Sequence, residues 1–406
     1  MRFGVLGMAQ IAGSAISFLT VILITRTGGA ATFGQIALAV SILSYAQQFT
    51  IFGTDISGTG ETAVRPKDLG LLLPAILLIR ILLATLSYSV ILLLGPLIAP
   101  SPSARLVLHI VGAGVFACAF YPTWLAQGLE NLKVTMIALV GPFAITLIFS
   151  TVASVMSPIG WTFGLARLVG DILMAIFLMI WAAKFFTSVG LAAVVEKAWF
   201  LVRKSSSIAA AQMVRGLAFL SDVLIVGWFT TNAALGHFGA SQRIYLLLTT
   251  ISYVYFTVVY PRLAKSAATS PFALSQQIQG ALKPGVLGAI AVSIVVAMAA
   301  PIGMPLAFGR EFVQSIVPMQ FLGLAAGIGF IHRIYGQALL ALDKASLFLQ
   351  LTAFATVIGV AIKVMATASY GINGTSVAIA ASELLMLGLV WFFARKAMAE
   401  ARQFAS

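Results

Sequence analysis

Residues 206–230, SSIAAAQMVRGLAFLSDVLIVGWFT, form an apolar stretch long enough to cross a membrane as one helix, yet its interior holds Gln212, Arg215 and Asp222. Arg215 and Asp222 share one helical face about two turns apart, which is too far for direct pairing. An ionisable side chain at the bilayer centre costs about 2.5 to 3.5 kcal/mol, so such residues usually face a bundle interior or a wet cavity. The segment is therefore predicted to form one wall of a polar pathway through the membrane.

The composition of the whole chain is also strongly apolar. Hydrophobic residues make up 61% of the 406, charged residues only 9%, and the mean hydropathy is +1.06. A soluble domain carries about 25% charged residues, so the chain is predicted to be an all-α polytopic membrane protein. The net charge of +13 is dispersed with no basic arm, so no nucleic-acid partner is expected. The single cysteine, Cys118, excludes a disulfide framework and a cysteine metal cluster, and no cofactor is predicted.

Windows of about twenty apolar residues predict twelve transmembrane helices. They lie at 4–24, 32–52, 76–98, 106–127, 134–156, 161–183, 206–230, 239–260, 286–307, 313–342, 347–368 and 374–394. Six spans form an N-terminal lobe, 1–183, and six form a C-terminal lobe with a short tail, 206–406. Residues 184–205 are predicted to link the lobes as an amphipathic helix on the cytoplasmic surface. The ends of the third and ninth spans are the least defined.

The basic residues outside the spans predict the orientation. With both termini in the cytoplasm, fifteen lie in inner segments and only Arg26, Arg105 and Arg310 in outer loops, as the positive-inside rule requires. The two halves also resemble a repeat, because Phe33-Gly34 and Phe238-Gly239 each stand at the entry to a returning helix. Two halves of the same orientation indicate a parallel repeat, with a substrate site expected in the cleft between them.

The charges inside the spans indicate the kind of substrate. Six are basic and three are acidic: Arg80, Arg167, Arg215, Arg243, Arg333 and Lys363 against Asp171, Asp222 and Glu383. A cationic surplus suits an anionic cargo such as a lipid diphosphate, because the arginine fork matches phosphate oxygens. The predicted substrate-binding residues are Arg215, Arg333, Arg80, Arg243, Lys363 and Arg26. Tyrosines such as Tyr45 and Tyr245 can hydrogen-bond or stack on sugars, or simply anchor helices.

Each of these residues also has a structural alternative. Arg215 and Arg333 could form buried structural pairs, while Arg26, Arg243 and Lys363 could snorkel to headgroups. Arg167 and Asp171 are one turn apart on the sixth span and are predicted to neutralise each other.

The acids are the candidates for coupling to a proton or sodium gradient. Asp222 is the first and Glu383 the second, because a carboxylate in a membrane cavity can exchange its charge as the cavity opens. For Asp222, a permanent ion pair with an arginine of a neighbouring helix is an equally good interpretation.

Several stretches together resemble the polysaccharide and O-antigen flippases of the Wzx type, in the multidrug/oligosaccharidyl-lipid/polysaccharide exporter superfamily. The stretches are TRTGGAATFGQIALA (25–39), Asp222 with VLIVGWFTTNAALGHFGASQRI (223–244), YPRLAKS (260–266), LAFGREFVQSIVPMQFLGLAAGIGF (306–330) and IHRIYGQALLALDKAS (331–346). The resemblance implies a V-shaped bundle of two six-helix lobes in a bacterial inner membrane. It implies a non-enzyme that moves an undecaprenyl-diphosphate-linked oligosaccharide from the inner to the outer leaflet. A polysaccharide polymerase is a further partner for such a flippase.

Two other functions compete with this interpretation. A cation-coupled small-molecule or drug antiporter of the same superfamily shares the fold, and Asp222 would then be its essential residue. A membrane-embedded glycan enzyme is less favoured, because no Walker A, HExxH or Asp-x-Asp sequence occurs and no extramembrane segment is much longer than the linker.

Overall fold

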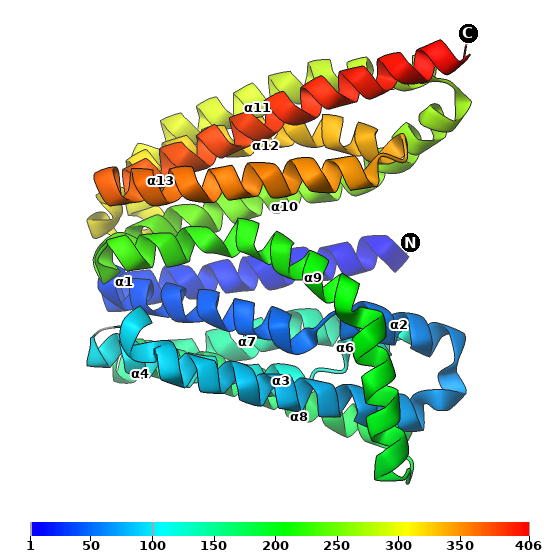
Figure 1. The fold of residues 1–406 in the computed structure, drawn as a ribbon. Coiled ribbons are helices and arrows are strands. Elements are labelled where there is room, and N and C mark those ends of the chain that lie inside the picture. The colour runs from blue at the N-terminus through cyan, green and yellow to red at the C-terminus, as the bar shows by residue number, and fades with distance from the viewer. Residues whose placement is uncertain (1, 100, 406) are drawn as a thin grey trace. The chain divides into compact units, whose positions relative to one another are not determined.

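The computed structural model describes residues 2–99 and 101–405, and within this part the protein is built from helices alone. Some side chains in 211–220, 253–271 and near the termini, that of Arg215 among them, lie outside the described residues. The chain forms two compact units, Met1–Gly236 and His237–Ser406 (Figure 1). Each unit is described by itself below.

Glycine makes the turn within the first helix. α1 (Arg2–Ile51) contains the first two predicted spans, which meet at Gly29 with φ 80° and ψ 178°. A positive φ is readily adopted only by glycine, so the chain turns there without ending its helical run. The rest of the first unit comprises α2 (Thr54–Val64), η1 (Pro66–Asp68), α3 (Leu69–Ile98), α4 (Pro102–Gly112), α5 (Gly114–Ala119), α6 (Thr123–Gly128), α7 (Leu132–Met156), α8 (Gly160–Ala182), η2 (Ala183–Phe185) and α9 (Leu191–Phe229).

Several predicted spans differ in detail from the helices that contain them; the ninth, for example, lies in α11, which begins at Pro271. The third span begins earlier than predicted, because α3 starts at Leu69. The fourth span is not one helix but the succession α4, α5 and α6, broken at Ala113 and again at 120–122. Pro122 explains the second break, because proline lacks a backbone donor and disfavours helical geometry at the preceding residue.

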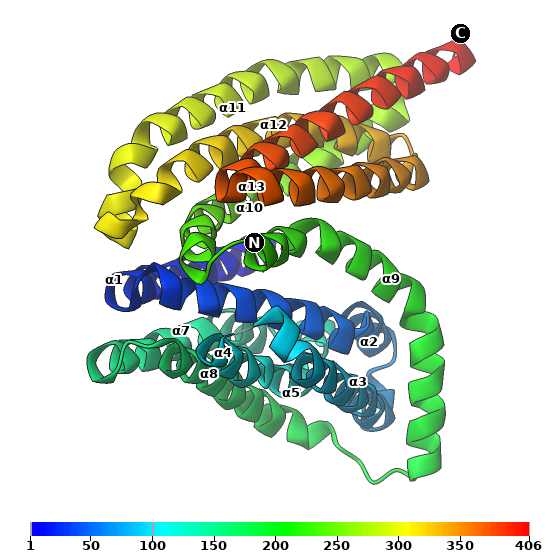
Figure 2. The ribbon, with the colours of Figure 1, turned by 60° about the vertical axis from the view of Figure 1, so that its left-hand side comes forward.

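The predicted linker from Leu191 onward and the seventh span form one continuous helix, α9, which Figure 2 shows curving along its length. Its first part packs on α3 through Val194, Ala198 and Leu201. Its second part packs on α1, where Gly216 lies against Gln48 and Gly227 against Leu38. These contacts place α9 in the first compact unit, so the lobe boundaries at 183 and 206 stay a prediction.

The second unit has four long helices and one short one. They are α10 (Asn232–Thr269), whose first residues fall in the first unit, α11 (Pro271–Phe308), η3 (Arg310–Ser315), α12 (Ile316–Ala341) and α13 (Ala345–Ala405). α13 turns back at Gly371, where φ is 57° and ψ −142°. The turn is tight. A Cβ at Gly374 would lie 2.1 Å from the Ala366 carbonyl oxygen, and the hydroxyls of Thr367 and Thr375 are 2.8 Å apart. Figure 1 shows the two halves of α13 lying alongside each other.

The described chain matches the predicted all-α membrane architecture. Eight helical stretches are long and apolar enough to cross a membrane, and two of them, Leu6–Ile51 and Ala345–Glu400, are the double helices that turn at Gly29 and Gly371. The predicted spans fall on helices throughout: six between α1 and α8, and six between the second part of α9 and α13. The fold is a polytopic bundle of twelve transmembrane segments in two sets of six.

Candidate functional site: polar clusters inside the apolar helices

A polar cluster lies inside the second unit, between α10, α12 and α13. Tyr245 donates a hydrogen bond from its hydroxyl to Oε1 of Glu383 over 3.0 Å. Nε2 of His332 lies 3.3 Å from Oε2 of the same carboxylate, within ion-pair distance but without hydrogen-bond alignment. The side chains of His332 and Glu383 are only 14% and 19% exposed. Three helices thus converge on one carboxylate in the apolar interior.

Gly329 leaves room for the Glu383 carboxylate because it has no side chain. A Cβ at Gly329 would lie 3.0 Å from Oε2 of Glu383, so the carboxylate lies directly over the backbone of α12. Gly329 and His332 are three residues apart and share one face of that helix. A larger residue at 329 would force the carboxylate to shift.

Arg333 is the cation next to this cluster on α12. Its Nη1 is buried and has no hydrogen-bond partner in the described part of the chain, while the side chain as a whole is partly exposed. A buried guanidinium nitrogen without an acceptor is costly, because the lost hydration is not replaced. An anionic ligand would supply that acceptor. Among the predicted substrate residues, Arg333 therefore has the geometry best suited to an anionic ligand.

Arg80 has its hydrogen-bonding capacity largely filled. It is 1% exposed on α3 and donates from Nε to the Thr54 hydroxyl over 2.9 Å and from Nη1 to the Tyr121 carbonyl over 2.9 Å. Nη2 donates to Asp55 over 2.5 Å. These bonds tie α3 to the start of α2 and to the break between α5 and α6. Its substrate-binding role stays a prediction, and its contacts fit a structural role.

Arg167 and Asp171 form the ion pair that their spacing predicts. Nε of Arg167 donates to Oδ2 of Asp171 over 2.9 Å, one turn apart on α8. Tyr121 joins them by donating to the Asp171 carbonyl over 3.0 Å. The pair neutralises itself within the first unit, as expected for a structural pair.

Asp222 is buried on α9, with 5% exposure, beside a polar face of α1. Its charge acts on Tyr45, whose hydroxyl is buried and has no hydrogen-bond partner among the described residues. Oε1 of Gln48 is likewise buried and without such a partner, against Gly216 of α9. The contact between α1 and the second part of α9 is thus a second polar region inside apolar helices.

The other predicted substrate residues are spread over several helices. Lys363 is 6% exposed on the first half of α13, Arg243 is half-buried on α10, and Arg26 is exposed on α1. The side chain of Arg215 lies outside the described residues. The structure does not test the binding roles of these four residues.

Sequence patterns alone did not predict that Tyr245, His332 and Glu383 lie close together. From the sequence, Tyr245 is predicted to contact sugars or to anchor a helix, and no pattern gives His332 a role. The three residues come from different helices, so no spacing rule relates them. The signal available was that each is polar inside an apolar run.

Comparison with known proteins identifies the family. The model of a family described as polysaccharide biosynthesis protein matches residues 2–267, well over half of the chain. The chain belongs to this polysaccharide biosynthesis protein family. This polysaccharide biosynthesis protein is also similar over 162 residues, at 24% identity, to the probable low-salt glycan biosynthesis flippase Agl15 of Haloferax volcanii. That alignment covers 40% of this chain and 34% of the relative, so the chain matches about a third of it.

Solved structures share the fold of this polysaccharide biosynthesis protein. A lipid II flippase MurJ in an inward closed conformation matches with a TM-score of 0.75 at 13% identity, covering 98% of this chain and 89% of that one. An inward-facing multidrug resistance MATE family transporter of the MOP superfamily matches with a TM-score of 0.68 at 13% identity, covering 98% and 100%. These matches show that the chain shares the fold of these two proteins.

Proposed function

We propose that this protein translocates an undecaprenyl-diphosphate-linked oligosaccharide from the inner to the outer leaflet of a bacterial cytoplasmic membrane by alternating access. The product would serve polysaccharide or O-antigen synthesis, with a polysaccharide polymerase as a downstream partner. The distribution of basic residues supports a cytoplasmic position for both termini. Membership of a polysaccharide biosynthesis family and similarity to a glycan flippase support the substrate class.

The single observation that carries the proposal is the buried Nη1 of Arg333, which has no hydrogen-bond partner among the residues that the structure describes. A guanidinium pairs with phosphate oxygens through hydrogen bonds, so a diphosphate headgroup would supply the acceptor that Nη1 lacks among the described residues. The surplus of cations over acids within the predicted spans also supports an anionic cargo. A carrier of organic cations would instead be expected to expose a surplus of acids to its cargo.

The carboxylate of Glu383 is the coupling group that the geometry supports best. It accepts a hydrogen bond from Tyr245 and lies beside His332, two groups that can hold or pass a proton at this position. Its protonation would change the charge next to Arg333 and hence the binding of an anion. Asp222, buried on α9, is the second coupling candidate, and the coupling ion would be a proton or sodium.

The test measures export in cells that lack the native copy and carry either wild type or Arg333→Gln. We expect the variant to reach the membrane at a normal level, to lose export by about tenfold or more, and to accumulate lipid-linked oligosaccharide on the inner leaflet. Arg310→Gln is the matched control, because Arg310 is exposed on η3. Arg215→Glu tests the other predicted arginine in the same assay. Normal polymer output from Arg333→Gln would refute the proposal.

The buried Asp222 favours the antiporter as the second candidate function. In that case Asp222→Asn would raise sensitivity to drugs while Arg333→Gln would have little effect. The flippase proposal instead requires that Arg333→Gln lowers surface polysaccharide and leaves drug sensitivity unchanged. Both variants therefore belong in the same strain set, with drug sensitivity and surface polysaccharide measured in parallel.

A further inference from the structure

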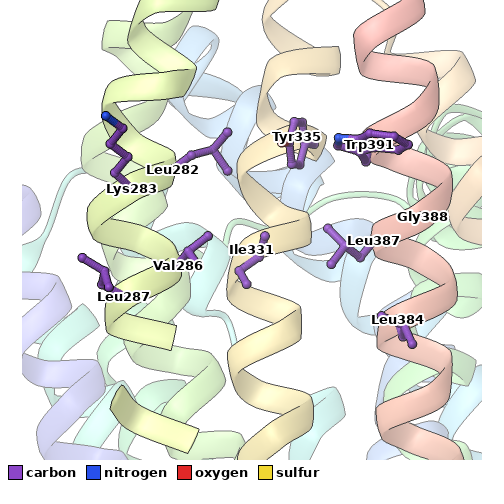
Figure 3. A pocket seen from close by; sticks show the side chains of 10 residues that line it. All are labelled: Leu282, Lys283, Val286, Leu287, Ile331, Tyr335, Leu384, Leu387, Gly388 and Trp391. Carbon is purple, nitrogen blue, oxygen red and sulfur yellow. The ribbon is translucent and has the colours of Figure 1, made fainter. Parts of the chain in front are cut away.

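The second unit has an apolar groove on its outer surface, with a volume of about 970 Å³. Leu282, Lys283, Val286 and Leu287 of α11 form one wall, Ile331 and Tyr335 of α12 the floor, and Leu384, Leu387, Gly388 and Trp391 of α13 the other wall (Figure 3). The volume is at the upper end of the range for small-molecule sites. All ten residues belong to the second unit.

The groove opens onto an exposed apolar face of the helices. Leu287, Ile290, Ile294, Met298 and Ile302 of α11 recur every three or four residues and are at least half exposed, so they form one continuous apolar stripe. Leu287 belongs to both this stripe and the groove. Because the stripe lies on a membrane-spanning helix, hydrocarbon chains rather than water would fill the groove.

The groove differs from the neighbouring polar cluster. Ile331 and Tyr335 are one turn apart on the groove face of α12, while His332 makes its contact with Glu383 on another face. The groove is therefore a separate feature of the α12 and α13 pair. None of its ten lining residues is acidic.

The polar groups of the groove gather at one end. Figure 3 shows the Lys283 amine, the Tyr335 ring and the Trp391 ring at the same level, with Leu287, Ile331 and Leu384 toward the other end. Arg395 adds a second cation there, since its guanidinium carbon lies 5.2 Å from the centre of the Trp391 ring and its charge acts on Tyr335. This pattern matches an amphiphile with an anionic head and a long apolar tail.

We propose that the groove binds the isoprenoid chain of the lipid-linked substrate, with its phosphate between Lys283 and Arg395. This inference rests on the proposed function and adds to it a tail site on the lipid-facing surface, apart from the buried Arg333. The isoprenoid phosphate is preferred to a membrane phospholipid because the family acts in glycan biosynthesis. Binding here would dock the carrier lipid on the transporter before its diphosphate moves to Arg333.

The experiment measures binding of undecaprenyl phosphate to the purified full-length protein by native mass spectrometry, with phosphatidylglycerol as competitor. Gly388→Leu adds apolar volume to the groove, and its Cβ would meet no atom within 4 Å. Gly303→Leu is the matched control, since a Cβ there also meets nothing within 4 Å and Gly303 does not line the groove. We expect about tenfold weaker binding for Gly388→Leu and an unchanged affinity for Gly303→Leu.

The charge test uses the double variant Lys283→Gln with Arg395→Gln. We expect its affinity for undecaprenyl phosphate to fall by about tenfold or more, while Lys396→Gln, the exposed neighbour of Arg395, has no effect. Equal binding of phosphatidylglycerol and undecaprenyl phosphate would show a site for bulk anionic lipid and overturn the proposal. Wild-type affinity in both Gly388→Leu and the double variant would overturn the proposal as well.

Export assays on the same variants separate this inference from the proposed function. If Arg333→Gln stops export while Gly388→Leu binds and exports normally, the flippase function stands and the tail site is wrong. If wild type binds undecaprenyl phosphate in the groove but moves no lipid-linked oligosaccharide, the tail site stands and the function is wrong.

Discussion

The hydroxyl of Tyr245 on α10 donates a 3.0 Å hydrogen bond to Oε1 of Glu383 on α13. The two residues are 138 positions apart, so the bond joins helices that only the folded chain brings together. The same carboxylate has His332 of α12 at 3.3 Å. One acidic side chain is thus the meeting point of three helices of the second unit, and its charge state bears on how these helices pack.

Tyr245→Phe is predicted to weaken this junction. The variant removes one hydrogen bond to a charged group, so we expect the free energy of unfolding of the second unit to fall by about 1.5 to 3 kcal/mol. Thermal unfolding in detergent measures the loss. Tyr370→Phe is the control, because Tyr370 on α13 is 75% exposed. Equal melting temperatures for the two variants would contradict the structural role of Tyr245.

Arg80→Gln is predicted to destabilise the folded protein. The guanidinium is 1% exposed and serves Thr54, Asp55 and the Tyr121 carbonyl, so its loss leaves buried polar groups unsatisfied. Breaking such a network costs about 3 to 5 kcal/mol. We expect a low yield of folded protein by fluorescence-detected size exclusion, whereas Arg65→Gln, an exposed residue, behaves as wild type. A stable Arg80→Gln protein with lost export would restore Arg80 as a substrate residue.

Gly34→Ala is predicted to disrupt the approach of α1 to the first turn of α10. A Cβ at Gly34 would lie 1.8 Å from the Asn232 carbonyl oxygen, and one at Gly236 would lie 1.9 Å from that of Ala30. Overpacking typically costs about 1 to 3 kcal/mol, and a clash with backbone relaxes less easily than one with a side chain. Thermal unfolding should show the full loss for Gly34→Ala. Gly60→Ala, where a Cβ meets nothing within 4 Å, should be neutral, and similar effects for both would argue against the close contact.

The Glu61 carboxylate on α2 is predicted to make stability depend on pH. Its hydrogen bond to Lys204, with the nearby charge of Lys197 at 3.5 Å, lowers the pKa of Glu61. Because the folded pKa lies below the unfolded value of about 4.3, the stabilisation is fully present above that value and is lost as the pH falls through the folded pKa.

The measurement for Glu61 compares melting temperatures of wild type and Glu61→Gln from pH 7 to pH 3. Wild type should be the more stable above the unfolded pKa of about 4.3, and the difference should shrink as the pH falls below that value. Glu400→Gln, at an exposed position of α13, should show no such trend. A difference that stays constant over this range would contradict the ion pairs between α2 and α9.

The sequence by itself determined the twelve membrane segments and the residues whose charges they bury. This succeeds because each span must satisfy its own backbone hydrogen bonds in hydrocarbon, which makes it a local property of about twenty residues. The pairing of Arg167 with Asp171 was equally local, since both lie on one turn of α8. The general place of the turns at Gly29 and Gly371 followed from where the apolar runs break, although neither glycine was singled out.

Only the tertiary structure decided what those buried charges contact. It placed Arg80 among Thr54, Asp55 and Tyr121, brought Tyr245 and His332 to Glu383, and left Nη1 of Arg333 without a partner among the described residues. It also divided the fourth span at Ala113 and Pro122 and joined the surface linker to α9. The physical reason is that a buried charge must find its partner on another helix, and which helix lies beside it is set by packing over the whole unit rather than by spacing along the chain.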